Sequence, residues 1–243
     1  MIVRGYSAGI EENINRPGDC FDKSLRVCLE IEMARRKGFE KLVFVGSSCM
    51  YPLDAPQPYK ESSLGLGGIE ETSAAHAYAN LAAYAQCKAY SKQYRVNYFT
   101  AIQADVYGEP GSTHFVEQIM RRMHYAKESG AKDIVIWGDG TAVREPMHVD
   151  DAERAITFVH KHYVGPAPIN LGTGIPYSIA AVARTIKEVV GFSGELVFDC
   201  AKSSGAPRKT LDSSKLFAMD FRNSLSLHEG LAKTYYDLKY HLR

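Results

Sequence analysis

The sequence has little that would mark a secreted, metal-binding or membrane-spanning protein. Its five cysteines, Cys20, Cys28, Cys49, Cys87 and Cys200, are scattered and form no CxxC pair, which argues against a disulfide framework and against a zinc site. No stretch approaches the roughly 18 apolar residues of a membrane-spanning helix, and the first residues lack the apolar core of a signal peptide. We therefore expect an unprocessed, soluble chain in a reducing, cytoplasmic compartment.

An excess of charge of either sign is also missing. Lysine and arginine number 29 against 28 aspartates and glutamates, which gives a formal net charge of +1. This balance argues against a nucleic-acid or membrane-surface partner, so any phosphate binding must be local. The 243 residues, 45% of them hydrophobic, are enough to bury a sizeable core.

Strand-like and helix-like segments alternate along the chain. Short apolar runs at 41–45, 98–104, 134–137, 168–171 and 196–199 predict buried strands, and helical spacing predicts helices over 20–37, 72–94, 114–128, 149–162, 178–190 and 226–241. This alternation predicts an α/β fold with a mostly parallel sheet and helices on both faces. We expect a truncated Rossmann-like core over residues 1–136 and a smaller, mainly substrate-binding α/β lobe over 137–243, with the chain crossing back between them.

Six motifs follow one another in a specific order: LVFVGSSCMYP at 42–52, DVYG at 105–108, IVIWGDGTAVREPMHVDD at 134–151, INLGTG at 169–174, ELVFD at 195–199 and GAPRKTLDSSKL at 205–216. Together they resemble the GDP-L-fucose synthase family of extended short-chain dehydrogenases/reductases, over nearly the whole chain. The resemblance implies an enzyme that epimerises a GDP-linked 4-keto-6-deoxy sugar at C3 and C5 and then reduces C4 with NADPH.

The first departure from this family concerns the glycine-rich turn that holds the dinucleotide. Family members open with a strand, a GxxGxxG turn and a helix that carries the cofactor pyrophosphate on its N-terminus. The first residues of this chain already match the segment that follows those elements. The glycines at 65, 67 and 68 follow no strand, and they predict only a loop.

The second departure concerns the family's Tyr-x-x-x-Lys pair, which donates a proton and holds the nicotinamide ribose. Counting from Ser47 and from DVYG places this pair on His76 and Asn80. Tyr84 and Lys88 have the right spacing but lie about 12 Å further along the same helix, and they predict a structural face. From both departures we expect no NAD(P) cofactor, and we expect no metal.

The residues that the resemblance assigns to epimerisation are present. Epimerisation needs a base, an acid on the opposite face and donors for the enolate oxygen. The resemblance places the acid/base pair on Cys49 and His114, with Ser47 donating to the C4 oxygen, and His76 adds a third acid/base group or an enolate donor. Each also has a plain alternative: packing for Cys49, an ordinary helix start for His114, a strand-end cap for Ser47 and a relic for His76.

Substrate-holding residues are expected by motif position at Arg122, Trp137, Arg144 and Lys209, because arginine forks match phosphate oxygens and an aromatic ring can stack on a base. Their alternatives are a solvated charge for Arg122, a core aromatic for Trp137 and salt bridges for the other two. Asp105 differs from the family, and a carboxylate repels a diphosphate. Three explanations stay open: Asp105 faces a sugar hydroxyl, Asp105 acts as a base itself, or the substrate is not the family's.

These observations predict a cofactor-independent epimerase or isomerase that removes a proton alpha to a ketone, on a nucleotide-linked 4-keto-6-deoxy sugar or a related ketone. One alternative is a non-catalytic binding or assembly protein derived from such an enzyme. Another is an NADP-dependent reductase that a second chain completes. The helices at 20–37 and 73–94 match the family's dimer-forming pair, and their apolar content predicts a homodimer.

Overall fold

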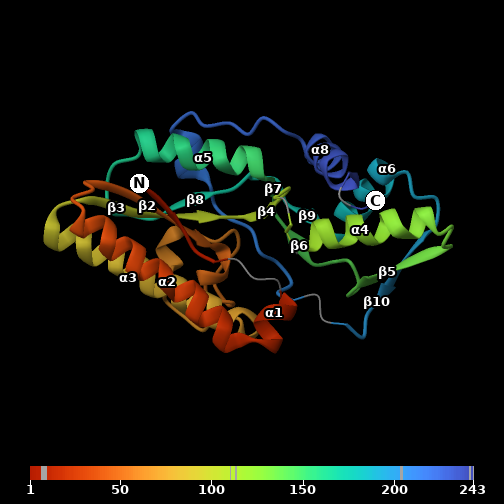
Figure 1. Ribbon diagram of the computed structural model, residues 1–243, viewed down its shortest axis with the longest axis horizontal. Coiled ribbons are helices and arrows are strands. Elements are labelled where there is room, and N and C mark those ends of the chain that lie inside the picture. The colour runs from red at the N-terminus through yellow and green to blue at the C-terminus, as the bar shows by residue number, and fades with distance from the viewer. Residues whose placement is uncertain (7–9, 110, 113, 203–204, 241, 243) are drawn as a thin grey trace. The chain divides into compact units, whose positions relative to one another are not determined.

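The computed structural model describes residues 1–6, 10–109, 111–112, 114–202, 205–240 and 242 (Figure 1). The chain forms two compact units. Unit 1 comprises residues 1–104, 152–174 and 210–222, and unit 2 comprises 105–151, 175–209 and 223–243. The first change of unit falls at 104/105, where the strand that starts at Asp105 pairs with residues 146–148.

Unit 1 is built on a four-stranded parallel sheet, which confirms the predicted fold class. The strand order is β1 (Ile2–Arg4), β2 (Lys41–Ser47), β3 (Asn97–Gln103) and β8 (Ile169–Leu171). β2 and β3 are buried on both faces along their middle five residues, as continuous apolar runs in parallel sheets usually are. All four strands end at the same edge of the sheet.

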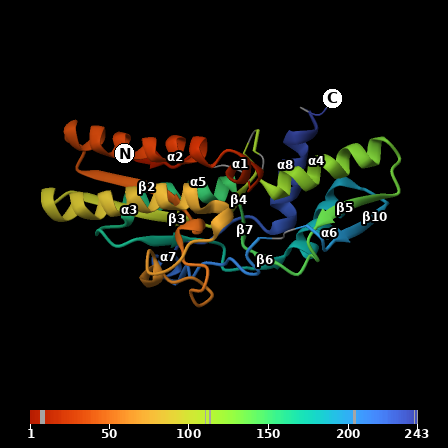
Figure 2. The same cartoon turned by 90° about the horizontal axis from the view of Figure 1, so that it is seen from below.

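Helices cover both faces of this sheet. α2 (Pro17–Arg36) and α3 (Ala74–Tyr94) lie side by side on one face, and α5 (Val149–His162) lies on the other (Figures 1 and 2). The short helices α1 (Ile10–Asn15) and α7 (Ser214–Ala218), with single 3₁₀ turns at Ser48–Met50, Glu61–Ser63 and Glu71–Ser73, complete the unit. Pro17 begins α2 at a position where its missing N–H costs nothing.

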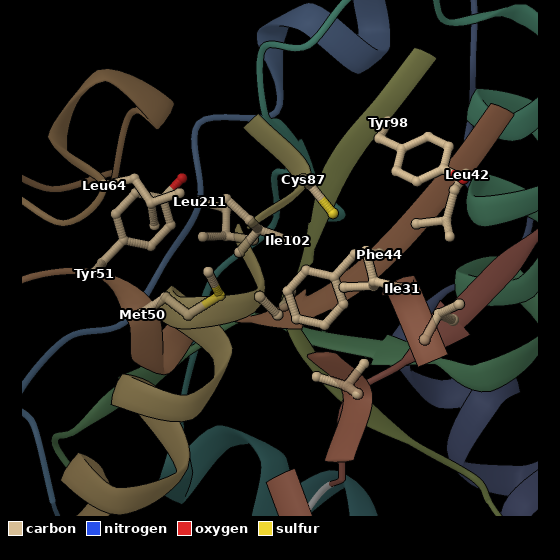
Figure 3. Close-up of a cluster of buried hydrophobic side chains, with 14 of the residues drawn as sticks. Ile31, Leu42, Phe44, Met50, Tyr51, Leu64, Cys87, Tyr98, Ile102 and Leu211 are labelled. Atoms are coloured by element: carbon tan, nitrogen blue, oxygen red, sulfur yellow. The ribbon is translucent and has the colours of Figure 1, made fainter. Parts of the chain in front are cut away.

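The core of unit 1 lies between the sheet and the pair α2 and α3. Leu42 and Phe44 lie two residues apart on β2, and they pack with Ile31 of α2 and Cys87 of α3 (Figure 3). Period-two alternation places these two strand residues on one face of the sheet. No helix within the described residues is long and apolar enough to cross a membrane.

The described residues of unit 2 form three short strand pairs and three packed helices. β4 (Asp105–Tyr107) pairs in parallel with β7 (Pro146–His148), β5 (Asp133–Trp137) pairs in parallel with β10 (Glu195–Asp199), and β6 (Val143–Arg144) pairs antiparallel with β9 (Tyr177–Ser178). The helices α4 (Phe115–Glu128), α6 (Ile179–Val190) and α8 (Leu227–Lys239) bury their apolar faces in a second core with β5. Ser178 caps α6 by accepting a hydrogen bond from the Ala181 N–H at 3.1 Å.

Candidate functional site

Ser47 and Cys49 lie at the carboxyl end of β2, the edge at which open α/β sheets usually bind ligands. The Ser47 hydroxyl accepts a hydrogen bond from the Cys49 N–H at 3.3 Å, and it thereby caps the 3₁₀ turn that carries the cysteine. Cys49 is partly exposed. Cys87, in contrast, is enclosed by the core, where burial raises the pKa of its thiol to about 12 and removes it from proton transfer near neutral pH.

His76 and Asn80 form a buried network between α2 and α3. His76 Nδ1 lies 3.2 Å from the Ser24 hydroxyl of α2, and the Asn80 side-chain amide donates to the His76 carbonyl at 2.7 Å. The Asn80 Oδ1 atom has no hydrogen-bond partner among the described residues, and it lies 2.6 Å from the place that a Cβ on Gly5 would take. The Asn80 donor is therefore already used inside the protein.

Tyr84 and Lys88, on the same helix, serve no such network. Tyr84 is half-buried and packs against the core of unit 1, whereas Lys88 is exposed. Both observations agree with the structural face that the spacing predicts for these two residues.

Asp105, at the start of β4, is the centre of a charged cluster in unit 2. Its side chain is only 10% exposed, and Oδ1 lies 3.1 Å from Lys209 Nζ and 3.9 Å from His114 Nε2. Burial alone raises the Asp105 pKa, but the Lys209 ammonium, His114 and the Arg144 guanidinium outweigh it and hold the pKa well below its usual range. Asp105 is thus a carboxylate at neutral pH, with Lys209 as its main counter-charge.

Glu117 is a second buried carboxylate beside His114, and the sequence interpretation does not include it. His114 is the N-cap residue of α4, and Glu117 lies one turn later with its side chain 1% exposed. Its Oε2 atom lies 3.8 Å from His114 Nδ1, and its Oε1 atom accepts a hydrogen bond from the Gly108 N–H at 2.6 Å. The spacing of three residues from a helix-start histidine is the only trace of this contact in the sequence.

The other expected substrate residues divide into two places within unit 2. Arg144 is buried, donates to the Val143 carbonyl at 2.8 Å and adds positive potential at Asp105. Trp137, at the end of β5, is 51% exposed, so the alternative of a core aromatic is wrong. Arg122 is exposed and donates to the Val135 carbonyl of the same strand. No group of three or more His, Cys, Asp or Glu side chains within the described part of the chain is placed to hold a metal ion.

Comparisons with known proteins agree with the parallel sheet and the motif order. The model of the NAD dependent epimerase/dehydratase family matches residues 1–172. The GDP-L-fucose synthase of Sinorhizobium fredii is 40% identical over 97% of this chain and 77% of its own length. The GDP-L-fucose synthase of Escherichia coli is 36% identical over 93% of this chain and 75% of its own length. The chain thus spans about three quarters of the length of these relatives.

A solved structure gives the same result. The GDP-mannoheptose C4 reductase of Campylobacter jejuni, determined with NADP bound, superimposes with a TM-score of 0.87 at 29% identity, over 98% of this chain and 81% of that one. The fold and these similarities define a Rossmann-like protein of the extended short-chain dehydrogenase/reductase type. The chain belongs to the NAD dependent epimerase/dehydratase family and, within it, to the GDP-L-fucose synthases.

These relatives overturn the expectation of a cofactor-independent epimerase. The matched relatives are GDP-L-fucose synthases, and the solved neighbour is a reductase with NADP bound, so the class to which the chain belongs joins epimerisation to reduction with a dinucleotide. That expectation rested on two departures, the glycine-rich turn and the residues at 76 and 80. The similarity to these relatives along nearly the whole chain carries more information about the class than the two local departures.

Proposed function

We propose that this chain binds a GDP-linked 4-keto sugar and takes part in its NADPH-dependent epimerisation and reduction. The observation that supports the proposal most is the identity of 36–40% to named GDP-L-fucose synthases over 93–97% of the chain. Cys49 and His114, to which the resemblance assigns the acid/base pair, would support the same class of reaction. We predict a reducing compartment, in which the Cys49 thiol would stay reduced and able to transfer a proton.

Proton transfer is the part of the reaction that side chains of this chain can perform. One group removes the proton alpha to the ketone, the C–H electron pair moves toward the carbonyl oxygen, and a second group returns a proton to the carbon. Cys49 and His114 are our candidates for these two groups, and Ser47 is our candidate donor to the oxygen. We propose that His76, which is buried beside Ser24 and Asn80, has a structural role in its helix pair.

The residues at 76 and 80 do not fit the redox pair that a nicotinamide cofactor needs in this family. A neutral asparagine amide supplies no positive charge, and Asn80 donates to the His76 carbonyl. His76 is buried with the hydroxyl of Ser24 beside its ring. We therefore assign no step of hydride transfer to these two residues.

This misfit favours a second candidate function, a non-catalytic protein that keeps GDP-sugar binding. The same charged cluster around Asp105 and Lys209 would then serve recognition alone. The two candidates differ in chemistry and not in ligand, so one experiment distinguishes them.

The experiment offers the purified chain GDP-4-keto-6-deoxymannose in heavy water, with and without NADPH. Calorimetry measures binding, absorbance follows NADPH consumption, and mass spectrometry counts deuterium in the recovered sugar. Binding with NADPH consumption and deuterium at carbon supports the enzyme. Binding without either supports the non-catalytic candidate. A dissociation constant weaker than about 1 mM, or about −4 kcal/mol, would refute both.

We also propose that the chain forms a homodimer through α2 and α3. Four large apolar side chains spaced four residues apart make an exposed stripe along α2: Phe21, Leu25, Leu29 and Met33, which are 37%, 36%, 61% and 51% exposed. Such a stripe on a helix surface is typical of an interface. Sedimentation should show a dimer at micromolar concentration, and Leu29→Glu should shift it to monomer. A monomeric native chain would contradict the proposal.

A further inference from the structure

Three buried polar atoms gather around His114 without a hydrogen-bond partner among the described residues. They are Asp105 Oδ2, His114 Nδ1 and Glu117 Oε2. Native structures leave few such atoms unpaired, so a cluster of them calls for an explanation. His114 thus stands between two carboxylates, one facing each ring nitrogen at 3.8–3.9 Å.

The two carboxylates are not equivalent. Asp105 has Lys209 Nζ at 3.1 Å, so its charge is balanced without the histidine. Within the described residues, no lysine or arginine forms an ion pair with Glu117, and the group of opposite potential charge that faces it is His114. The arrangement therefore couples Glu117 to the imidazole more closely than a surface glutamate in a first helical turn would be coupled.

Glu117 is itself fixed in place by the strand that carries Asp105. Its Oε1 atom accepts from the N–H of Gly108 at 2.6 Å, and Gly108 directly follows β4. Gly108 has a φ of +96° and a Cβ there would lie 2.9 Å from the His148 ring, so this turn has little freedom to move. The glutamate thus joins the turn after β4 to the first turn of α4, where His114 is the cap.

We propose that Glu117 is a positioning residue that holds the His114 imidazole in the orientation in which it exchanges a proton with the substrate. The expected effect of Glu117 on turnover rests on the proposed function, whereas its effect on the orientation of the His114 ring does not. The partner on one ring nitrogen determines how the other nitrogen is presented, and here Glu117 faces Nδ1. A helix-stabilising acid in the first turn would need neither the burial nor the second contact.

The kinetic test compares Glu117→Ala and Glu117→Gln with the native chain. Alanine removes the acceptor for Gly108 and the group that faces His114, and a misplacement of about 1 Å costs about 10²-fold in rate. We expect kcat to fall about 10²-fold with KM within about twofold, since only transition-state positioning is lost. Glutamine keeps an acceptor for Gly108 and should recover kcat to within about tenfold. An unchanged kcat in Glu117→Ala, or a KM that rises as much as kcat falls, would overturn the proposal.

A second readout does not depend on turnover. In the free chain with isotope-labelled histidine, the His114 ring resonances should change in both variants, and those of His124 on the same helix, which contacts the Tyr235 hydroxyl at 3.0 Å, should not. Glu128→Gln, at the exposed end of α4, is the matched control and should leave the His114 ring unchanged. If Glu117→Ala unfolds, Glu117→Gln alone carries the comparison.

The two readouts distinguish the failure of this inference from the failure of the proposed function. A native chain that turns over no GDP-sugar contradicts the enzyme, while a shifted His114 ring still supports the role of Glu117. A His114 ring that is unchanged in both Glu117 variants overturns the positioning role, whatever the activity.

Discussion

Replacing Asp105 with asparagine should destabilise unit 2 in a pH-dependent way. The change keeps the size of the side chain and removes the charge that faces Lys209 at 3.1 Å. Hydrogen bonds to charged groups contribute about 1.5–3 kcal/mol. Because the Lys209 side chain is 21% exposed and recovers part of its hydration, we expect a loss near the lower end, about 1.5–2 kcal/mol at pH 7.

The direction of the pH effect follows from the Asp105 pKa, which lies below its usual value of 3.8 in the folded chain. The carboxylate therefore contributes its full stabilisation above about pH 4, and this contribution is lost as the pH falls toward the folded-state pKa. Asparagine has no proton to gain. The difference between the native chain and Asp105→Asn should thus be constant between pH 5 and 8, about 3–8 °C in Tm, and it should shrink below about pH 4.

Thermal unfolding followed by tryptophan fluorescence suits this test, because the sole tryptophan, Trp137, lies on β5 in the same unit as Asp105. Asp133→Asn, at the exposed start of β5, is the matched control and should change stability by less than about 0.5 kcal/mol. If the native chain and Asp105→Asn melt at the same temperature at pH 7, or if the difference between their Tm values grows below pH 4, Asp105 is not a charge-balanced buried carboxylate.

Two further sets of variants test the site and its supporting turn. Cys49→Ser and His114→Asn should each lower turnover by about 10² to 10⁴, while the affinity for the GDP-sugar stays within about threefold. Steady-state kinetics measures the turnover and calorimetry measures the affinity. Full activity in both variants would mean that neither residue carries a proton. Gly108→Ala, at φ +96° with the His148 ring 2.9 Å from the new Cβ, should cost about 1–3 kcal/mol. Gly111→Ala, at φ +76° with nothing within 4 Å, should cost less, and the difference in Tm measures the steric part.

The sequence predicts the long elements of this fold within a few residues. The helices at 17–36, 74–94 and 149–162 and the strands at 41–47 and 97–103 all show their periodicity or apolar run over enough residues to be recognised. Strands such as Val143–Arg144 and Tyr177–Ser178 have only two residues each. A period cannot be seen in two residues, so these pairings are set by the neighbours that the rest of the fold supplies.

The site shows the same limit at the level of contacts. Motif order locates Asp105, His114 and Lys209, but it does not show that they contact one another, since Lys209 is about a hundred residues away in the chain. Glu117 is an ordinary acid in a first helical turn by sequence. Its burial and its bond to Gly108 depend on β4 ending beside α4, which only the tertiary structure determines.

The Asp105 and Lys209 pair bears on which part of a GDP-sugar the cluster suits. The resemblance predicts that Lys209 helps to hold the nucleotide diphosphate-sugar, but a carboxylate at 3.1 Å takes up much of its charge. A phosphate at this position would meet Asp105 as a like charge, and in a buried place that repulsion is weakly screened. Because carboxylate oxygens accept hydrogen bonds, we propose that the pair of Asp105 and Lys209 suits a hydroxyl donor such as a sugar ring carries better than it suits an anion.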